Sequence, residues 1–225
     1  AEAASKPPQR LATWKRAVYS GNVDHAKKLF ADMRTDGWSP TVAHYTAMCC
    51  AFAKRRQFRE AEDCFYEMKR AGVKPDVLAY GMMVDAFARQ GDIDRSMRWI
   101  GRMEDAGMRP TEITYGTIAG ALARRGDAAG TVAMVGRMED VGLVPGVVTH
   151  TAVVGAFAKR GEVAKSLEWL ERMEDAGVKP NVVTYNTMLD AFAKRGDIAS
   201  TMQWFNKMED AGVKPDEVTY NTMVA

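Results

Sequence analysis

The stretch MEDAGVKPNVVTYNTMLDAFAKRGDI, residues Met173–Ile198, decides the fold because the chain repeats it. Met208–Asn221 reads MEDAGVKPDEVTYN, Met68–Tyr80 reads MKRAGVKPDVLAY, and Met103–Tyr115 reads MEDAGMRPTEITY. Beyond residue 8, prolines stand only at positions 40, 75, 110, 145, 180 and 215, each 35 residues after the last. A fixed period of this length is typical of proteins built from stacked repeats.

Each repeat is taken to begin two residues after its proline. This gives six repeats and a partial seventh: 7–41, 42–76, 77–111, 112–146, 147–181, 182–216 and 217–225. The array is expected over residues 11–225, after a polar, flexible N-terminal tail at residues 1–10. The partial repeat has no second helix to cover Tyr220 and Met223, so we expect the natural chain to continue past Ala225 or this end to meet a partner.

The first half of a repeat has the pattern of an amphipathic helix. In repeat 182–216, Tyr185, Met188 and Phe192 recur at i, i+3 and i+7, which places them on one helical face. Thr184 is a suitable N-cap, and the pattern therefore predicts a first helix over Tyr185–Lys194.

The second half predicts another helix, running to about Ala211. Gly196 breaks the first helix, and Asp197 is well placed to cap the second. Gly212 and Pro215 then prevent continuation. The buried side of this helix is predicted to carry Met202, Phe205 and Met208.

The fold predicted is all-α. One helical hairpin cannot bury both of its faces, so the hairpins are expected to stack into an α-solenoid superhelix, right- or left-handed. The methionine that recurs in the second helices is expected to pack between helices. Trp99, Trp169 and Trp204 share one position there and are expected to be partly buried against the next repeat.

Composition gives no sign of catalysis. The three cysteines, Cys49, Cys50 and Cys64, lack metal-ligand spacing, and His25, His44 and His150 lie far apart. Buried thiols in a reducing compartment are therefore the expectation. No known catalytic motif occurs, and no enzyme activity, metal or cofactor is expected. No apolar run approaches the roughly 20 residues of a membrane helix.

The net charge of +2 conceals a separation of signs. First helices end in basic residues, as at Lys194-Arg195, whereas second helices end in acidic ones, as at Glu209-Asp210. A basic helix C-terminus suits the helix dipole, but an acidic one does not. A spaced basic row suits a phosphate backbone, and this pattern favours phosphate contact over simple solvation.

The 35-residue hairpin with VVTYNTMLDAFAKRGDI and MEDAGVKPD closely resembles the P-type pentatricopeptide repeat (PPR), well over residues 42–225 and loosely over 7–41. The resemblance implies a single-stranded RNA-binding protein that reads one base per repeat. It also implies an organellar location, mitochondrion or chloroplast, and a role in RNA processing, stability or translation.

The resemblance assigns roles by position within the repeat. The fifth and the last residue together select a base, the second residue wedges between bases, and a basic residue late in the first helix contacts phosphate. Base selection then falls to Thr46 with Asp76, Thr151 with Asn181, Asn186 with Asp216, and Asn221. The wedges are Leu78, Ile113, Val148, Val183 and Val218, with Ala43 a poor one. The phosphate contacts are Lys54, Arg89, Arg124, Lys159 and Lys194.

These pairs resemble the family's pairings for guanine, adenine and uracil, which gives the register 5′-GNNAU-3′. Repeat 7–41 departs from the pattern with Leu11 and Thr41. Repeats 77–111 and 112–146 have glycine as fifth residue, Gly81 and Gly116, and are expected to read no base. As an alternative, Asp76, Asn181 and Asp216 favour a helix N-terminus without reading RNA.

Two other functions remain open from the sequence. One is a scaffold subunit of a large organellar ribonucleoprotein complex, such as a ribosome or transcription machinery, which contacts other protein subunits. The other is the RNA-targeting arm of an enzyme whose catalytic domain lies outside this chain.

Overall fold

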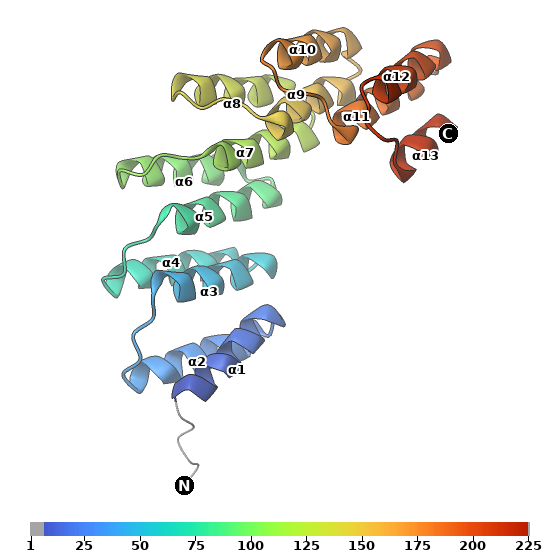
Figure 1. Ribbon diagram of the computed structural model, residues 1–225. Coiled ribbons are helices and arrows are strands. Elements are labelled where there is room, and N and C mark those ends of the chain that lie inside the picture. Colours follow the sequence, from blue (N-terminus) through green and yellow to red (C-terminus); the bar gives the residue numbers. More distant parts are fainter. Residues whose placement is uncertain (1–6, 225) are drawn as a thin grey trace. The chain divides into compact units, whose positions relative to one another are not determined.

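The computed structural model describes residues 7–224, which form thirteen helices and no strands (Figure 1). They make two compact parts, divided after Pro110. The first part contains α1 (Pro7–Tyr19), α2 (Val23–Thr35), α3 (Val42–Lys54), α4 (Phe58–Arg70), α5 (Val77–Gln90) and α6 (Ile93–Asp105). The second contains α7 (Glu112–Arg124), α8 (Ala128–Asp140), α9 (Val147–Lys159), α10 (Val163–Asp175), α11 (Val182–Ala193), α12 (Ile198–Asp210) and α13 (Glu217–Val224).

Consecutive helices pair as hairpins, and the hairpins stack through their first helices. In the first part α3 packs on α1 and α5, and in the second α9 packs on α7 and α11, with α13 following α11. Each second helix from α2 to α12 packs on its own first helix, and α2, α4, α8 and α10 also pack on the first helix of the following hairpin. The predicted all-α stack of 35-residue hairpins is confirmed.

First helices begin earlier than predicted. The N-cap of α11 is Asn181, whose side chain accepts the N–H of Thr184 at 3.1 Å, so the prediction of Thr184 as cap is wrong. Thr184 instead completes a capping box, because its hydroxyl accepts the N–H of Asn181 at 3.3 Å. The predicted cap of the second helix, Asp197, is confirmed, since it accepts the N–H of Ser200.

The tail expected at residues 1–10 is wrong in its last part. Residues 1–6 lie outside the described residues, but residues 7–10 form the first turn of α1. Two prolines do not prevent this, because the N–H groups of a helix's first turn have no intrahelical partner for proline to remove.

The turn inside each hairpin needs a left-handed residue. Gly91 and Gly196, for example, have φ of 86° and 67°. Repeat 42–76 has Arg56 at this point, and Arg56 adopts φ 61°, the one positive φ among the described residues other than glycine. A side chain in this region costs about 1–2 kcal/mol relative to the right-handed region, so Arg56 introduces backbone strain.

The methionine stripe of the second helices is core, as predicted. All six methionines, Met33, Met68, Met103, Met138, Met173 and Met208, are buried. The prediction that Met202 is buried is wrong, because it is 46% exposed. The buried face of α12 instead carries Thr201, one residue before Met202, and Trp204, two residues after it. The apolar pattern alone therefore predicted the wrong face.

The tryptophans were predicted to pack against the next repeat, but Trp99 packs against Phe65 and Tyr66 of the preceding one. The described ring contacts of Trp169 and Trp204 are within their own repeats, with His150 and with Tyr185 and Phe192. Trp99 donates to Glu62 at 3.3 Å, and the cation three residues after each tryptophan lies over its ring. These cations also pair with acids of the preceding repeat, Arg172 with Glu139 and Lys207 with Glu174. Part of the acidic row at the ends of second helices is thus explained by ion pairs between neighbouring repeats.

Two of the three cysteines are buried thiols as expected, Cys49 in α3 and Cys64 in α4. Cys50 is partly exposed, and all three are free thiols. The Cys64 side chain beside it and burial both raise the pKa of the Cys49 thiol, which keeps it protonated and unreactive.

His150 is a buried titratable residue in the second part of the chain. It stands where the other first helices carry the buried Tyr45, Tyr80, Tyr115 and Tyr185. It is 2% exposed, and neither ring nitrogen has a hydrogen-bond partner among the described residues. Burial, and secondarily the Arg172 guanidinium, lower the pKa of His150.

Replacing Arg56 by glycine tests the backbone strain. Arg56→Gly should raise the midpoint of thermal unfolding, because relief of about 1–2 kcal/mol exceeds the entropy that glycine adds to the unfolded chain. The matched control, Gly161→Arg, places an arginine at φ 74° in another repeat and should lower the midpoint. A lower midpoint for Arg56→Gly would contradict the assignment of strain.

His150 should make stability depend on pH. Because its folded pKa lies below its unfolded value of about 6.5, the folded state binds fewer protons. The free energy of unfolding should be highest above that value and fall as the pH drops through it. Urea unfolding at pH 8 and pH 5 should show a smaller loss in His150→Tyr. The pKa of His44 is also lowered by burial, so the variant should retain that part of the slope. An unchanged slope would contradict the role of His150.

Candidate nucleic-acid interface

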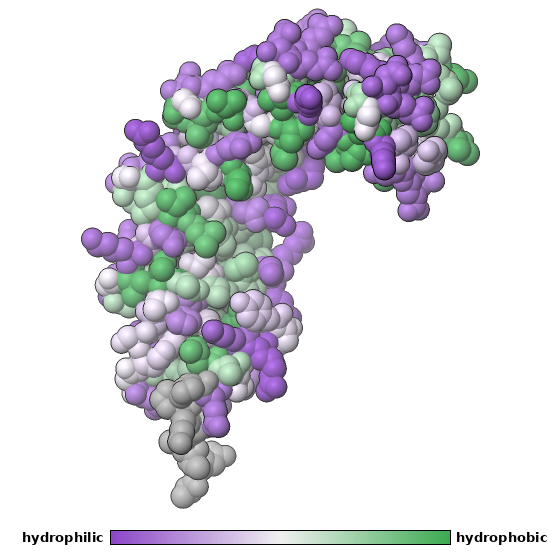
Figure 2. Space-filling model, viewed as in Figure 1, coloured by the Kyte–Doolittle hydropathy of each residue, from purple (hydrophilic) through white to green (hydrophobic). Residues whose placement is uncertain are grey.

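From repeat 77–111 to the partial repeat 217–225, the second residue is an exposed apolar side chain at the start of a first helix. Leu78, Ile113, Val148, Val183 and Val218 are 56–80% exposed. On the face shown in Figure 2, hydrophobic side chains are interspersed with hydrophilic ones on each part. Aliphatic residues exposed at a fixed position in successive repeats do not serve the core, which leaves them available to a ligand.

A groove of about 560 Å³ in the second part brings many of the predicted residues together. Two predicted wedges, Val148 and Val183, line it with two base-selecting residues, Thr151 and Asn181. The groove also reaches two cations late in the first helices, Arg124 and Lys159. Small residues open it, because Gly120, Ala123, Ala152 and Gly155 supply the remaining lining together with Thr187. Apolar side chains, polar side chains and cations that line one groove suit a nucleotide.

Asn186 and Asp216 form a fixed polar pair. The Asn186 amide N–H donates to Asp216 Oδ1 at 2.9 Å, and its carbonyl oxygen accepts the Thr219 hydroxyl at 2.6 Å. The Thr219 N–H and the Asn186 amide hold the pKa of Asp216 below its usual value. The amide therefore keeps one N–H and one lone pair, a donor beside an acceptor, for a further partner.

The other two pairs are held differently. Thr151 contacts the Thr184 hydroxyl at 2.7 Å, and Thr184 in turn donates to Asn181 at 3.1 Å. Thr46 instead donates to the Val42 carbonyl at 2.9 Å, four residues back in its own helix. The next repeat has Ala79 in place of a threonine there, so no hydroxyl is present for Thr46 to meet.

The last residue of a repeat is a helix cap, as the alternative interpretation required. Asp76 accepts the N–H of Ala79, and Asp216 that of Thr219. Capping and base reading do not exclude each other, because a carboxylate or amide oxygen has further lone pairs.

The sequence analysis missed the third residue of the repeat. Thr184 and Thr219 each contact two residues of the preceding repeat, its fifth residue and its last residue. The available signal was that threonine stands directly before the aromatic residue in 112–115, 147–150, 182–185 and 217–220.

The predicted phosphate contacts fall into two classes. Arg89 and Lys194 form ion pairs with carboxylates four residues earlier, Asp85 and Asp190. Arg124 and Lys159 have Gly120 and Gly155 at that place, and Lys159 contacts the carbonyl of Arg124. Their charge is not neutralised within the helix.

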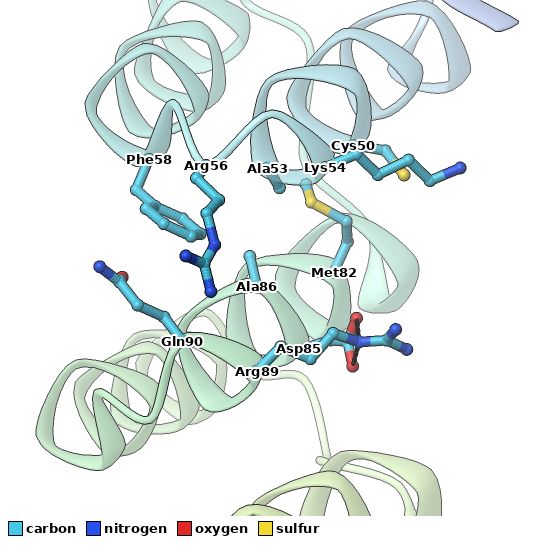
Figure 3. Close-up of a pocket in the computed structure, with 10 residues that line it drawn as sticks. All are labelled: Cys50, Ala53, Lys54, Arg56, Phe58, Met82, Asp85, Ala86, Arg89 and Gln90. Atoms are coloured by element: carbon cyan, nitrogen blue, oxygen red, sulfur yellow. Dashed lines mark hydrogen bonds and ion pairs between the residues drawn. The ribbon is translucent and has the colours of Figure 1, made fainter. Parts of the chain in front are cut away.

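A hollow of about 460 Å³ in the first part shows where two of these cations point. Lys54 and Arg89 line it and extend to the same side in Figure 3, where Asp85 lies against Arg89. Arg56 points elsewhere, toward Gln90 of α5. Asn221 lies in α13, and its partner in the repeat would follow residue 225.

Two classes of site were not found in the described part of the chain. Residues 7–224 contain no group of three or more His, Cys, Asp or Glu able to hold a metal. None of their helices is both long enough and apolar enough to span a bilayer.

Solved structures with the same fold include three from plants. The pentatricopeptide repeat protein PPR10 from maize is 26% identical with a TM-score of 0.62, over 93% of this chain and 35% of that one. Its complex with an 18-nt psaJ RNA element matches at 24% identity with a TM-score of 0.60, and the match covers 92% of this chain and 34% of that one. The PPR domain of Arabidopsis thaliana protein-only RNase P 1, in complex with tRNA, matches at 17% identity with a TM-score of 0.61. This match covers 77% of this chain and 91% of that one.

The chain thus spans about a third of the length of the maize protein. A comparison with curated proteins gives no significant match. A model of the PPR repeat family matches residues 40–89, 145–194 and 180–225, and a PPR repeat model matches 18–38 and 78–108. Since these matches cover more than half of the residues, the chain belongs to the PPR repeat family.

Proposed function

We propose that this chain binds single-stranded RNA and reads it one base per repeat. The groove of the second part carries the proposal, because it places two wedges, two polar selectors and two cations around one space. A base would lie between Val148 and Val183, its edge toward Thr151 and Asn181, and its phosphate toward Arg124 or Lys159. Two relatives of the same fold are described in complexes with RNA, one with a psaJ element and one with tRNA.

The remaining details rest on the family resemblance. The proposed target contains 5′-GNNAU-3′, with guanine at repeat 42–76, adenine at 147–181 and uracil at 182–216. The chain itself performs no chemistry in this proposal and acts by occupying RNA, in the processing, stability or translation of organellar transcripts. A scaffold role in a larger complex is the outcome that failure to bind RNA would favour.

The pair at Asn186 gives a test of base reading at one position. The chain should bind a GNNAU oligonucleotide more tightly than its complement at the same salt concentration. Asn186→Thr should move the preference at the last position from uracil toward guanine, because a hydroxyl replaces the amide donor and acceptor. Preferences at the other positions should not change. Equal affinity for the oligonucleotide and its complement, or an unchanged profile in the variant, would refute base reading.

The two classes of cation predict different salt effects. Lys159→Ala should reduce the slope of log Kd against log salt by about 0.7, the value for one phosphate contact on a single strand. Lys194→Ala is the matched control and should change the slope less, because Asp190 already neutralises Lys194. Affinity titrations at several salt concentrations measure both slopes. Equal effects of the two variants would contradict the proposed phosphate path.

A further inference from the structure

Repeat 112–146 lacks both side chains used by the proposed reading, because its fifth and last residues are Gly116 and Gly146. It differs from its neighbours in one more respect. Its first residue is Glu112, whereas repeats 42–76, 77–111, 147–181 and 182–216 all begin with valine. Of these five repeats, the one that begins with a glutamate is therefore also the one whose last residue has no side chain.

The Glu112 carboxylate occupies the place of the missing last side chain. Its Oε1 accepts the N–H of Gly146 at 3.0 Å. A Cβ built on Gly146 would overlap this oxygen, so any other residue there would displace the carboxylate. Gly146 has no side-chain cap of its own, and Glu112 is half-buried against it. The carboxylate thus lies where Asp76 and Asp216 carry theirs in other repeats.

The place of the fifth side chain is buried and faces a polar atom. A Cβ on Gly116 would come within 3.1 Å of the Thr149 hydroxyl, which is 1% exposed and has no hydrogen-bond partner among the described residues. The equivalent hydroxyls of Thr184 and Thr219 are bonded to Thr151 and Asn186. Repeat 112–146 therefore offers a carboxylate without a competing fifth side chain.

We propose that Glu112 is the base-selecting residue of repeat 112–146 and that its carboxylate favours guanine. This inference rests on the proposed RNA-binding function. A carboxylate only accepts hydrogen bonds, and two of its lone pairs can take parallel donors. Guanine presents N1–H and the N2 amino group side by side. Adenine and cytosine place a ring acceptor beside their amino group, and uracil flanks its N3–H with two carbonyls, so each would set an acceptor against a carboxylate oxygen.

The proposed target is then 5′-GNGAU-3′, and among the five repeats from 42 to 216 only 77–111 is without a selector. The competing explanation is that Glu112 merely caps the N-terminus of α9 through the Gly146 N–H. Base preference at one position separates the two, because a cap affects stability and not the third base.

The test measures Kd of the full chain for four oligonucleotides, 5′-GNXAU-3′ with X as each base. The wild-type chain should prefer guanine at X by about tenfold. Glu112→Gln keeps an oxygen for the Gly146 N–H and replaces the other with a donor, so the preference should fall to about twofold or less. Thermal unfolding should change little. Glu217→Gln, which removes the same charge from the first residue of another repeat, should leave the preference at X unchanged.

A second variant shows whether a lost preference comes from the missing carboxylate or from misfolding. Glu112→Ala combined with Gly146→Asp returns a carboxylate from the last residue and should restore the preference for guanine. The inference is overturned if the wild type shows no preference at X while it still selects uracil at the last position, or if Glu112→Gln keeps the wild-type profile. If no oligonucleotide binds even at low salt, the proposed function itself fails.

Discussion

The first helices begin with backbone N–H groups that have no partner inside the helix, and the way the chain satisfies them arranges the candidate site. The last residue of the preceding repeat is the cap. Asp76, Asn181 and Asp216 each accept an N–H three residues ahead. A group that caps a helix of the next repeat is fixed in position, and in repeat 182–216 it also fixes the amide of Asn186.

This constraint limits which residues can stand last in a repeat. Those present are Thr41, Asp76, Thr111, Gly146, Asn181 and Asp216, all of them residue types favoured at N-caps. Exchanging one cap type for another costs little stability, whereas it changes the donors and acceptors that the proposed reading would present to a base. Repeat 112–146 differs, because its last residue is Gly146 and the Glu112 carboxylate, from the first residue of the repeat, accepts the N–H of Gly146.

The second helices serve a separate purpose. The tryptophans of α6, α10 and α12 each have a cation over the ring, and each of these cations pairs with an acid of the preceding repeat. Exposed ion pairs contribute at most about 1 kcal/mol each, so the buried methionines and rings beneath them supply most of the stability. In the first helices the fifth residue of the repeat varies, as Gly81, Gly116, Thr151 and Asn186 show.

The sequence by itself determined the repeat, its two helices, the glycine turns and the position of each candidate site residue, because a strict period makes every copy evidence for the others. It misplaced the start of α11 by three residues and the packing direction of Trp99, since both depend on contacts with a neighbouring repeat. Only the tertiary structure brought Val148, Val183, Thr151 and Asn181 into one groove, linked Asn186 to Asp216 through Thr219, and placed Glu112 at Gly146. These contacts join residues about 30 to 35 positions apart, and stacking, which sets side chains of successive repeats against one another, is what brings them within hydrogen-bond distance.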